Sequence, residues 1–198
     1  MALDPDMRSG IAFLLVALVA IAGCDKQSPG PEQANVATSP ANETSSDAQA
    51  QAGEIDRSHA GEAPPDAPFT APDGKQVSIA DFKGKPVLVN LWATWCAPCI
   101  AEMPTLDALA TDMKGKLTVL PVSQDLDGAD RVDPWFAKAD YATLKPYLDP
   151  NLSLSAAYAA NLPTTILYDA QGKEVWRVTG KFDWASQQAH DLIAEAKN

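Results

Sequence analysis

The chain has little positive charge and almost no histidine. Its 198 residues include 15 lysines and arginines against 26 aspartates and glutamates, a net charge of −11, and only two histidines, His59 and His190. Because no basic cluster is present to neutralise a phosphate backbone, nucleic-acid binding is excluded. The two histidines lie far apart in the sequence, and neither is expected to take part in catalysis.

A long apolar run is also missing. Ile11–Ala22 is uninterrupted but has only 12 residues, too few to cross a bilayer of roughly 30 Å as a helix and suited to the apolar core of a signal peptide. It leads into Ala22-Gly23-Cys24, which resembles the lipobox of bacterial lipoproteins. The resemblance implies that residues 1–23 are a signal peptide and that Cys24 becomes the lipidated first residue of the mature chain. The alternative to a lipobox is an ordinary apolar segment that is followed by a cysteine by chance.

The residues around this apolar run bear on where the chain starts and where it is retained. Asp4 and Asp6 precede Arg8, whereas signal peptides open with positive charge, so Met7 is an alternative start. Asp25 after the cysteine resembles the signal that keeps enterobacterial lipoproteins in the inner membrane. We therefore expect the protein on the periplasmic side of the bacterial membrane, at the inner rather than the outer membrane.

Large apolar side chains are almost absent from residues 24–66, which are rich in proline, alanine, serine, glutamine, asparagine and glutamate. Such a segment buries too little apolar surface to offset the entropy of ordering its backbone. We predict a disordered tether over residues 24–66, beginning at the lipidated Cys24, and one folded domain over residues 67–198.

The folded domain alternates between strand and helix patterns. Pro72-Asp73-Gly74 predicts a hairpin within Pro68–Ile79, and the nearly continuous apolar run Pro86–Ala93 predicts a strand covered on both faces. Ala97–Met113 has apolar residues three to four positions apart, as a helix requires. Pro121 cannot donate to a ladder and predicts a sheet edge or a bulge near the end of its strand. Further strands are expected at Leu117–Ser123, Leu144–Leu148, Thr164–Asp169 and Glu174–Thr179, and further helices at Asp130–Ala139, Ser153–Ala160 and from Trp184. This order predicts an α/β fold with a mixed sheet.

The three cysteines separate into the isolated Cys24 and a C-x-x-C pair, Cys96 and Cys99. A strand precedes the pair and a helix follows it, so Cys96 lies where the helix begins and Cys99 one turn inside. The partial positive charge of a helix N-terminus stabilises a thiolate and lowers the pKa of Cys96. We predict that Cys96 attacks a substrate disulfide and that the more buried Cys99 resolves the mixed disulfide. The alternative is that the C-x-x-C pair only binds a metal ion or only packs in the core, without redox chemistry.

Two longer segments resemble one family. Asn90–Pro104 reads NLWATWCAPCIAEMP and Asn161–Asp169 reads NLPTTILYD; both are similar to the thioredoxin superfamily and to its TlpA-like branch, which includes ResA and CcmG. The resemblance covers nearly all of residues 67–198. It implies a thioredoxin fold with a mixed central sheet, an N-terminal hairpin extension and the branch's central insertion, here between Gln124 and Asp149.

The resemblance also implies roles for single residues. Pro163 matches the family's cis-proline that faces the dithiol, and the backbone of Leu162 is expected to pair with an extended substrate segment. Glu102 matches the acidic residue of the C-x-x-C-x-x-E pattern, so it is expected to tune Cys99 or relay its proton. A surface glutamate on the helix is the alternative for Glu102.

Three neighbours of the dithiol bear on the direction of the reaction. Trp95 is expected to shield the thiols and contact substrate, with simple packing as the alternative. Pro98, also assigned to substrate contact, resembles the reductant members of the family, whereas strong oxidants tend to carry a histidine there. Asn90 stands where thioredoxin has a buried aspartate, so that proton acceptor is missing and more of the role falls to Glu102.

The resulting hypothesis is an extracytoplasmic, membrane-anchored thiol-disulfide oxidoreductase that reduces disulfides in specific exported proteins, as in cytochrome c maturation or oxidase copper-site assembly. Because the extracytoplasmic space is oxidising, it implies a transmembrane thiol donor of the DsbD or CcdA type. No cofactor is expected.

Two other functions stay open from the sequence. The pair could serve as a dithiol oxidant, or its soft thiolates could hold copper(I) in a metallochaperone module. No histidine lies near the pair in sequence, and Met103 is better explained as part of the helix core. A peroxiredoxin-type peroxidase is disfavoured, because Ala93 stands where that pattern has a threonine.

Overall fold

The computed structural model describes residues 53–196, so the expected signal peptide, Cys24 and most of the expected tether lie outside the described residues. The strands are β1 (Glu54–Asp56), β2 (Phe69–Thr70), β3 (Gln76–Val77), β4 (Val87–Trp92), β5 (Thr118–Ser123), β6 (Tyr147–Leu148), β7 (Thr164–Tyr168) and β8 (Glu174–Thr179). The helices are the 3₁₀ helix η1 (Ile79–Phe82) and the α-helices α1 (Ala97–Asp112), α2 (Ala129–Ala139), α3 (Ser153–Tyr158) and α4 (Gln187–Ile193). None of the helices within 53–196 has the length and apolar character needed to cross a membrane.

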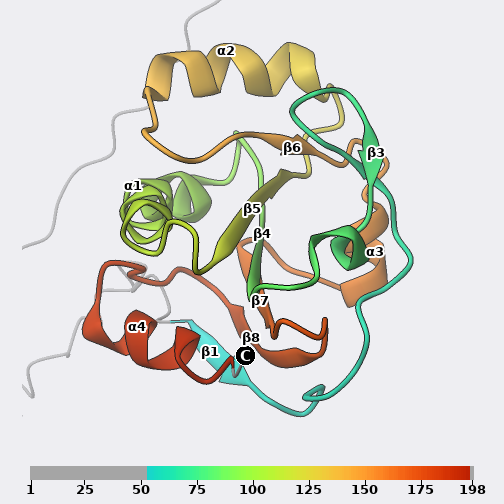
Figure 1. Ribbon diagram of the computed structural model, residues 1–198. Coiled ribbons are helices and arrows are strands. Elements are labelled where there is room, and N and C mark those ends of the chain that lie inside the picture. Colours follow the sequence, from blue (N-terminus) through green and yellow to red (C-terminus); the bar gives the residue numbers. More distant parts are fainter. Residues whose placement is uncertain (1–52, 197–198) are drawn as a thin grey trace, which may run out of the picture. The chain divides into compact units, whose positions relative to one another are not determined.

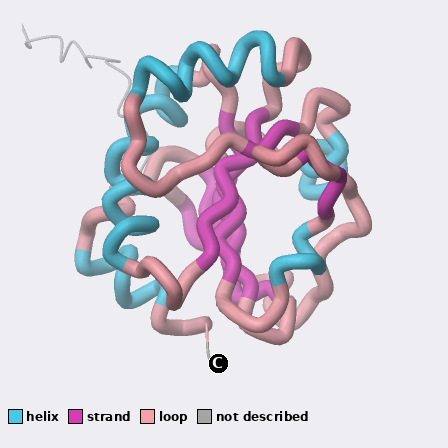
Figure 2. The backbone as a smooth tube through the Cα atoms, turned by 45° about the horizontal axis from the view of Figure 1, so that its top comes forward, coloured by secondary structure: helices cyan, strands magenta, loops and turns pink. Residues whose placement is uncertain are grey.

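All the strands form one mixed sheet in the order β1-β8-β7-β4-β5-β6-β2-β3. The sheet is the central layer, with α1 and α4 on one side and α3 on the other (Figures 1 and 2). β4 pairs parallel with β5 and antiparallel with β7. The α/β fold with a mixed sheet, predicted from the alternating patterns, is confirmed.

β4 divides the hydrophobic core into two halves. Its six residues are all buried, as expected for a central strand covered on both faces. Leu88 and Trp92 face the core beneath α1 and α4, whereas Val87, Val89 and Leu91 face the core beneath α3. Period-two alternation places Asn90, the one polar residue of β4, on the α1 side with Leu88 and Trp92.

Both family-specific additions are present. β2 and β3 form an antiparallel hairpin in which Phe69 lies opposite Val77, and the hairpin extends the sheet because Thr70 pairs with Leu148 of β6. The insertion between Gln124 and Asp149 supplies α2 and β6. α2 packs on the same face as α1, with the Trp135 ring 4.8 Å from the ring of Trp92.

The predicted boundary of the tether is wrong over residues 53–66. β1 pairs antiparallel with β8, placing Ile55 opposite Val178, and Ile55 packs against the core. The backbone N–H of Gly61 donates to the carbonyl of Glu174 at 2.8 Å, and the N–H of Glu174 donates to Glu62 at 2.9 Å. The folded part therefore begins at least as early as Gly53. The composition of residues 53–66 did not indicate that they are ordered, because backbone hydrogen bonds, which any sequence can make, hold them against β8.

Pro121 lies where one side of β5 has no partner strand, which is the expected edge on a local scale, and no bulge interrupts the β4–β5 register. β5 lies inside the sheet, and its pairing with β4 is regular through Pro121. Thr118 and Gln124, an even number of residues apart, donate their N–H groups to carbonyls on the β4 side at 2.9 and 2.8 Å. The nitrogen of Pro121 therefore faces β6, whose pairing with β5 begins only at Val122. Proline has no N–H group to donate, and at Pro121 no residue of β6 lies opposite to accept one.

Candidate active site

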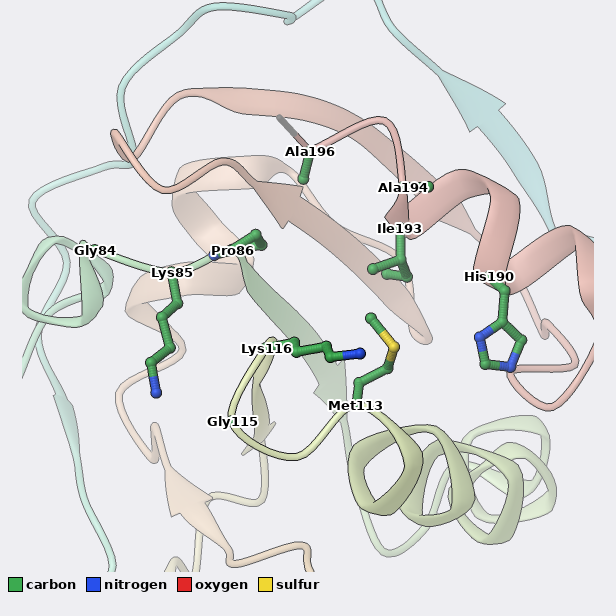
Figure 3. Close-up of a pocket in the computed structure, with 10 residues that line it drawn as sticks. All are labelled: Gly84, Lys85, Pro86, Met113, Gly115, Lys116, His190, Ile193, Ala194 and Ala196. Atoms are coloured by element: carbon green, nitrogen blue, oxygen red, sulfur yellow. The ribbon is translucent and has the colours of Figure 1, made fainter. Parts of the chain in front are cut away.

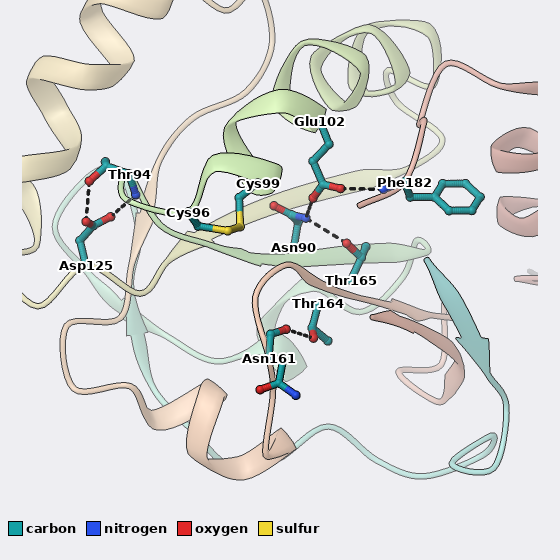
Figure 4. The surroundings of a disulfide bond; sticks show 10 residues. All are labelled: Asn90, Thr94, Cys96, Cys99, Glu102, Asp125, Asn161, Thr164, Thr165 and Phe182. Carbon is teal, nitrogen blue, oxygen red and sulfur yellow. Dashed lines mark hydrogen bonds between the residues drawn. A yellow bond between two sulfur atoms is a disulfide. The ribbon is translucent and has the colours of Figure 1, made fainter. Parts of the chain in front are cut away.

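The two cysteines form a disulfide at the start of α1 (Figure 4). Cys96 is the residue before the first helical turn, and its carbonyl accepts the N–H of Ile100 at 3.0 Å. Cys99 lies one turn inside the helix and is fully buried, whereas Cys96 is 6% exposed. The helix start and the deeper burial of Cys99, both predicted from the sequence, are confirmed. The N–H groups of this first turn offer positive partial charge to a sulfur anion at Cys96.

Glu102 occupies the next turn of α1, on the buried face shared with Cys99 and Met103. Its side chain is 1% exposed, so it is not a surface glutamate. Oε2 accepts the backbone N–H of Phe182 at 3.0 Å, and Oε1 accepts Nδ2 of Asn90 at 2.8 Å. Burial raises the pKa of Glu102 to about 7, although these two hydrogen bonds act in the opposite direction. The carboxyl can therefore gain or lose a proton near neutral pH.

Asn90 links this carboxyl to the sheet. The residue is fully buried, and Nδ2 also donates to Oγ1 of Thr165 on β7 at 2.9 Å (Figure 4). From the sequence, the only inference from Asn90 was that the buried aspartate of thioredoxin, a proton acceptor, is missing here. The structure shows that its amide holds Glu102 in place.

The loop before β7 reaches the same end of the sheet as the disulfide. The Leu162–Pro163 peptide bond is cis, as the family resemblance implied. Thr164 pairs with Leu91 near the end of β4, so Pro163 lies beside the strand end that leads into Cys96. Thr164 Oγ1 donates to the carbonyl of Asn161 at 2.5 Å, which closes the loop.

A groove lies beside the disulfide loop. Its volume is about 600 Å³, and Trp95 and Leu162 line it together with Leu126 and Leu152. Trp95 and Leu126 are each 70% exposed, the two large apolar side chains so exposed within residues 53–196. The structure thus brings together Trp95 and Leu162, which were assigned to substrate contact from the sequence. Pro98 is exposed on the first turn of α1 and is not among the residues that line this groove.

Asp125 is a site residue that sequence reasoning missed. Its carboxylate accepts the backbone N–H of Thr94 at 2.9 Å and the Thr94 hydroxyl at 2.6 Å. Ser123 Oγ donates a third hydrogen bond at 2.7 Å. Because Thr94 and Asp125 are 31 residues apart, no local spacing could have indicated the pairing.

A second cavity, of about 530 Å³, lies at the opposite end of β4 and α1 (Figure 3). Lys85 and Lys116 line it together with His190 of α4. His59 forms a surface hydrogen bond of 3.1 Å with Glu62. Neither histidine is at the disulfide, and residues 53–196 hold no group of three or more His, Cys, Asp or Glu side chains able to bind a metal ion.

The fold and the C-x-x-C disulfide at the start of α1 define a thiol-disulfide oxidoreductase with a thioredoxin-like fold, an enzyme that acts on protein disulfides. The Redoxin family model matches residues 59–193, more than half of the chain, so the protein belongs to the Redoxin family.

Individual relatives agree with this assignment. The thiol-disulfide oxidoreductase ResA of Bacillus thuringiensis subsp. konkukian (strain 97-27) is 32% identical over 122 residues, which are 61% of this chain and 70% of the relative. A DsbE-type thiol:disulfide interchange protein from Chlorobium tepidum has a similar fold, with a TM-score of 0.62 and 23% identity over 69% of this chain and 96% of that one. The exposed lipoprotein thioredoxin Etrx1 of Streptococcus pneumoniae strain TIGR4 is 28% identical, with a TM-score of 0.53, over 63% of this chain and 96% of that one. The chain is thus a ResA/CcmG-like oxidoreductase.

Proposed function

We propose that this oxidoreductase is an extracytoplasmic, membrane-anchored reductant of disulfides in specific exported proteins, of the cytochrome c maturation or oxidase copper-site assembly type. The observation that carries the redox chemistry is the disulfide between Cys96 and Cys99 at the N-terminus of α1, one turn from the buried carboxyl of Glu102. The exposed apolar groove beside it supports a protein rather than a small molecule as substrate.

The reaction starts from the dithiol form. The Cys96 thiolate attacks one sulfur of the substrate disulfide, a mixed disulfide forms, and the first substrate sulfur leaves as a thiolate. Cys99 then loses its proton and attacks Cys96 Sγ, which closes the bond seen in the structure and releases the second substrate thiolate. Two electrons pass to the substrate, and the enzyme is left oxidised.

Glu102 is the proposed acceptor of the Cys99 proton. Cys99 and Glu102 lie on the same buried face of α1, one turn apart. Because burial raises its pKa to about 7, Glu102 can take up the proton that Cys99 releases and return it when the disulfide is reduced again. Leu162 and Pro163, beside the same strand end, are proposed to meet the extended substrate segment, with Trp95 and Pro98 as further contacts.

Membrane anchoring is proposed through Cys24. The support is the lipobox-like sequence before it and the similarity to Etrx1, a protein named as an exposed lipoprotein. We propose that the domain lies on the periplasmic side of the inner membrane. There the oxidised enzyme needs an electron supply from the cytoplasm, for which a transmembrane thiol donor of the DsbD or CcdA type is the proposed partner.

Trapping tests the substrate assignment. In a Cys99→Ser variant the mixed disulfide on Cys96 cannot be resolved, so defined exported proteins should accumulate as reducible adducts. The matched control is Cys96→Ser, which keeps Cys99 and should trap none of them. A spread of nonspecific adducts would overturn the proposal of specific substrates, and a reduction potential near about −120 mV would identify an oxidant instead.

Anchoring is tested separately with Cys24→Ser, produced in a Gram-negative bacterium. The unsubstituted protein should sediment with the inner membrane and incorporate labelled fatty acid, and the variant should do neither. Equal membrane association of the two proteins would contradict lipidation at Cys24.

A further inference from the structure

The amide of Asn90 has an oxygen with no partner. Asn90 is fully buried, and the two hydrogen bonds of its Nδ2, to Glu102 and Thr165, occupy both N–H groups. When Glu102 is ionised, this orientation of the amide is favoured, because a flipped amide would set its carbonyl against the Glu102 carboxylate. Within residues 53–196, Asn90 Oδ1 accepts no hydrogen bond. Burying an acceptor in this way costs stability in the disulfide form, and a donor that meets the acceptor in another state of the protein would stabilise that state.

The unpartnered oxygen points toward the disulfide. In Figure 4, the Oδ1 end of Asn90 is directed at the Cys96–Cys99 bond, and the Nδ2 end is directed at Glu102 and Thr165. A disulfide sulfur has no hydrogen to donate, whereas a thiol is a weak donor. Reduction of the disulfide therefore creates an S–H donor on the side to which the buried Asn90 Oδ1 points. Cys99 is the fully buried partner, on the helix face that packs over β4.

We propose that Asn90 is a positioning residue for the resolving cysteine: in the reduced protein its Oδ1 accepts the S–H of Cys99 while its Nδ2 keeps hold of Glu102. This inference rests on the proposed roles of the two cysteines. When a partner dithiol reduces the enzyme, a partner thiolate attacks Cys96 Sγ. The S–S bond breaks, and Cys99 leaves with the electron pair and takes up a proton. The second partner thiol then releases Cys96, and the partner becomes a disulfide.

The hydrogen bond needs a Cys99 thiol, which the disulfide form lacks, so it stabilises the dithiol form relative to the disulfide. It also holds the Cys99 sulfur on the side of Glu102. The charged groups that face this site are the Glu102 carboxyl and Lys181, whose positive charge acts on that carboxyl. Asn90 thus links the oxidation state of Cys96 and Cys99 to the Glu102 carboxyl, which exchanges a proton with Cys99.

The S–H stretching vibration of Cys99 gives a direct test. In a Cys24→Ser/Cys96→Ala protein Cys99 is the sole thiol, and its infrared band should lie at the lower frequency of a hydrogen-bonded S–H. Adding Asn90→Leu should shift the band up to the frequency of a free thiol. The matched control, Thr165→Val, removes the other partner of the amide and should leave the band in place. An unshifted band in the Asn90→Leu protein overturns the proposal.

Two measurements extend the test to the intact sulfur pair. With both cysteines present, Asn90→Leu should lower the equilibrium constant for reduction by glutathione about fivefold, which is about 20 mV in potential. If Asn90→Leu does not fold, the ¹³Cγ resonance of Asn90 in the unsubstituted protein should move downfield on reduction, and an unchanged resonance overturns the proposal equally. Failure of the trapping experiment would contradict the proposed function but would leave both spectroscopic results intact.

Discussion

The carboxylate of Asp125 holds the backbone N–H of Thr94 at 2.9 Å and its hydroxyl at 2.6 Å, two residues before Cys96. Asp125 belongs to the insertion that follows β5 and supplies α2 and β6, and Thr94 belongs to the loop that carries the reactive cysteine. The insertion is therefore fastened to the disulfide loop by a buried carboxylate that makes three short hydrogen bonds, the third from Ser123.

Replacing Asp125 with alanine should leave the Thr94 N–H and two hydroxyl groups without their acceptor. We expect the free energy of unfolding to fall by about 1–3 kcal/mol, measured by urea denaturation of the oxidised protein. Asp127→Ala is the control, because the Asp127 side chain is 68% exposed and its loss should change stability by about 0.5 kcal/mol or less. Equal effects of the two variants would show that the Thr94 contacts contribute nothing.

The titration of Glu102 should appear in the pH dependence of stability. Burial raises its pKa from 4.5 to about 7 in the folded protein, so between these values the folded state holds a proton that the unfolded chain has lost. Stability should therefore fall as the pH rises from about 4.5 to about 7, by about 3 kcal/mol from this group alone. Glu102→Gln should remove this part of the slope.

Urea denaturation of the oxidised protein at pH 5 and pH 8 measures the effect. Asp127→Asn, at an exposed carboxylate whose ion-pair partner is Arg131, is the control and should keep the slope of the unsubstituted protein. Parallel pH profiles for the Glu102→Gln and unsubstituted proteins would refute the raised pKa.

The groove beside the disulfide should affect kcat/KM for protein disulfides and leave the reduction of small disulfides unchanged. Trp95→Ala and Leu126→Ala each remove an exposed apolar side chain, so stability should change by about 0.5 kcal/mol or less. For a protein disulfide, kcat/KM should fall about 5–10-fold, the equivalent of about 1–1.4 kcal/mol of lost apolar contact. Reduction of a small disulfide such as oxidised glutathione should be unchanged.

Lys116→Ala is a matched control for these variants, since it changes a side chain of the second cavity, at the far end of α1. It should leave both substrates unaffected. A loss of kcat/KM that is the same for the protein and the small disulfide would place Trp95 and Leu126 outside substrate recognition.

The strand that precedes the predicted domain boundary should contribute to stability. A chain that starts at Gly53 keeps β1, whereas a chain that starts at Ala67 loses its pairing with β8 and the backbone bonds of Gly61 and Glu62 to Glu174. Several hydrogen bonds of about 0.5–1.5 kcal/mol each are lost, so the shorter chain should be less stable by about 2–4 kcal/mol in urea. Indistinguishable midpoints would mean that β1 is dispensable.

Much of the domain could be predicted because its signals are local. Pro86–Ala93 is apolar almost without a break, and Ala97–Met113 repeats apolar residues at helical spacing; the structure has β4 at Val87–Trp92 and α1 at Ala97–Asp112. The disulfide followed from a spacing of three residues at a helix start. The burial of Glu102 was one of two alternatives, which the packing of α1 on β4 decides.

What escaped prediction depends on contacts between distant parts of the chain. Asp125 finds its partner 31 residues away, and β1 is fastened by backbone groups that carry no sequence signal. That β5 is nevertheless an interior strand could not be foreseen from Pro121, because the side to which its nitrogen points depends on the register with the neighbouring strands. The roles of Leu126 and Leu152 in the groove likewise depend on how the insertion folds back toward Trp95.

The outermost strands of the sheet, β1 and β3, have three and two residues. Short borders of this kind give a foreign polypeptide almost no free ladder to extend, which protects a protein from self-association when many copies are crowded together.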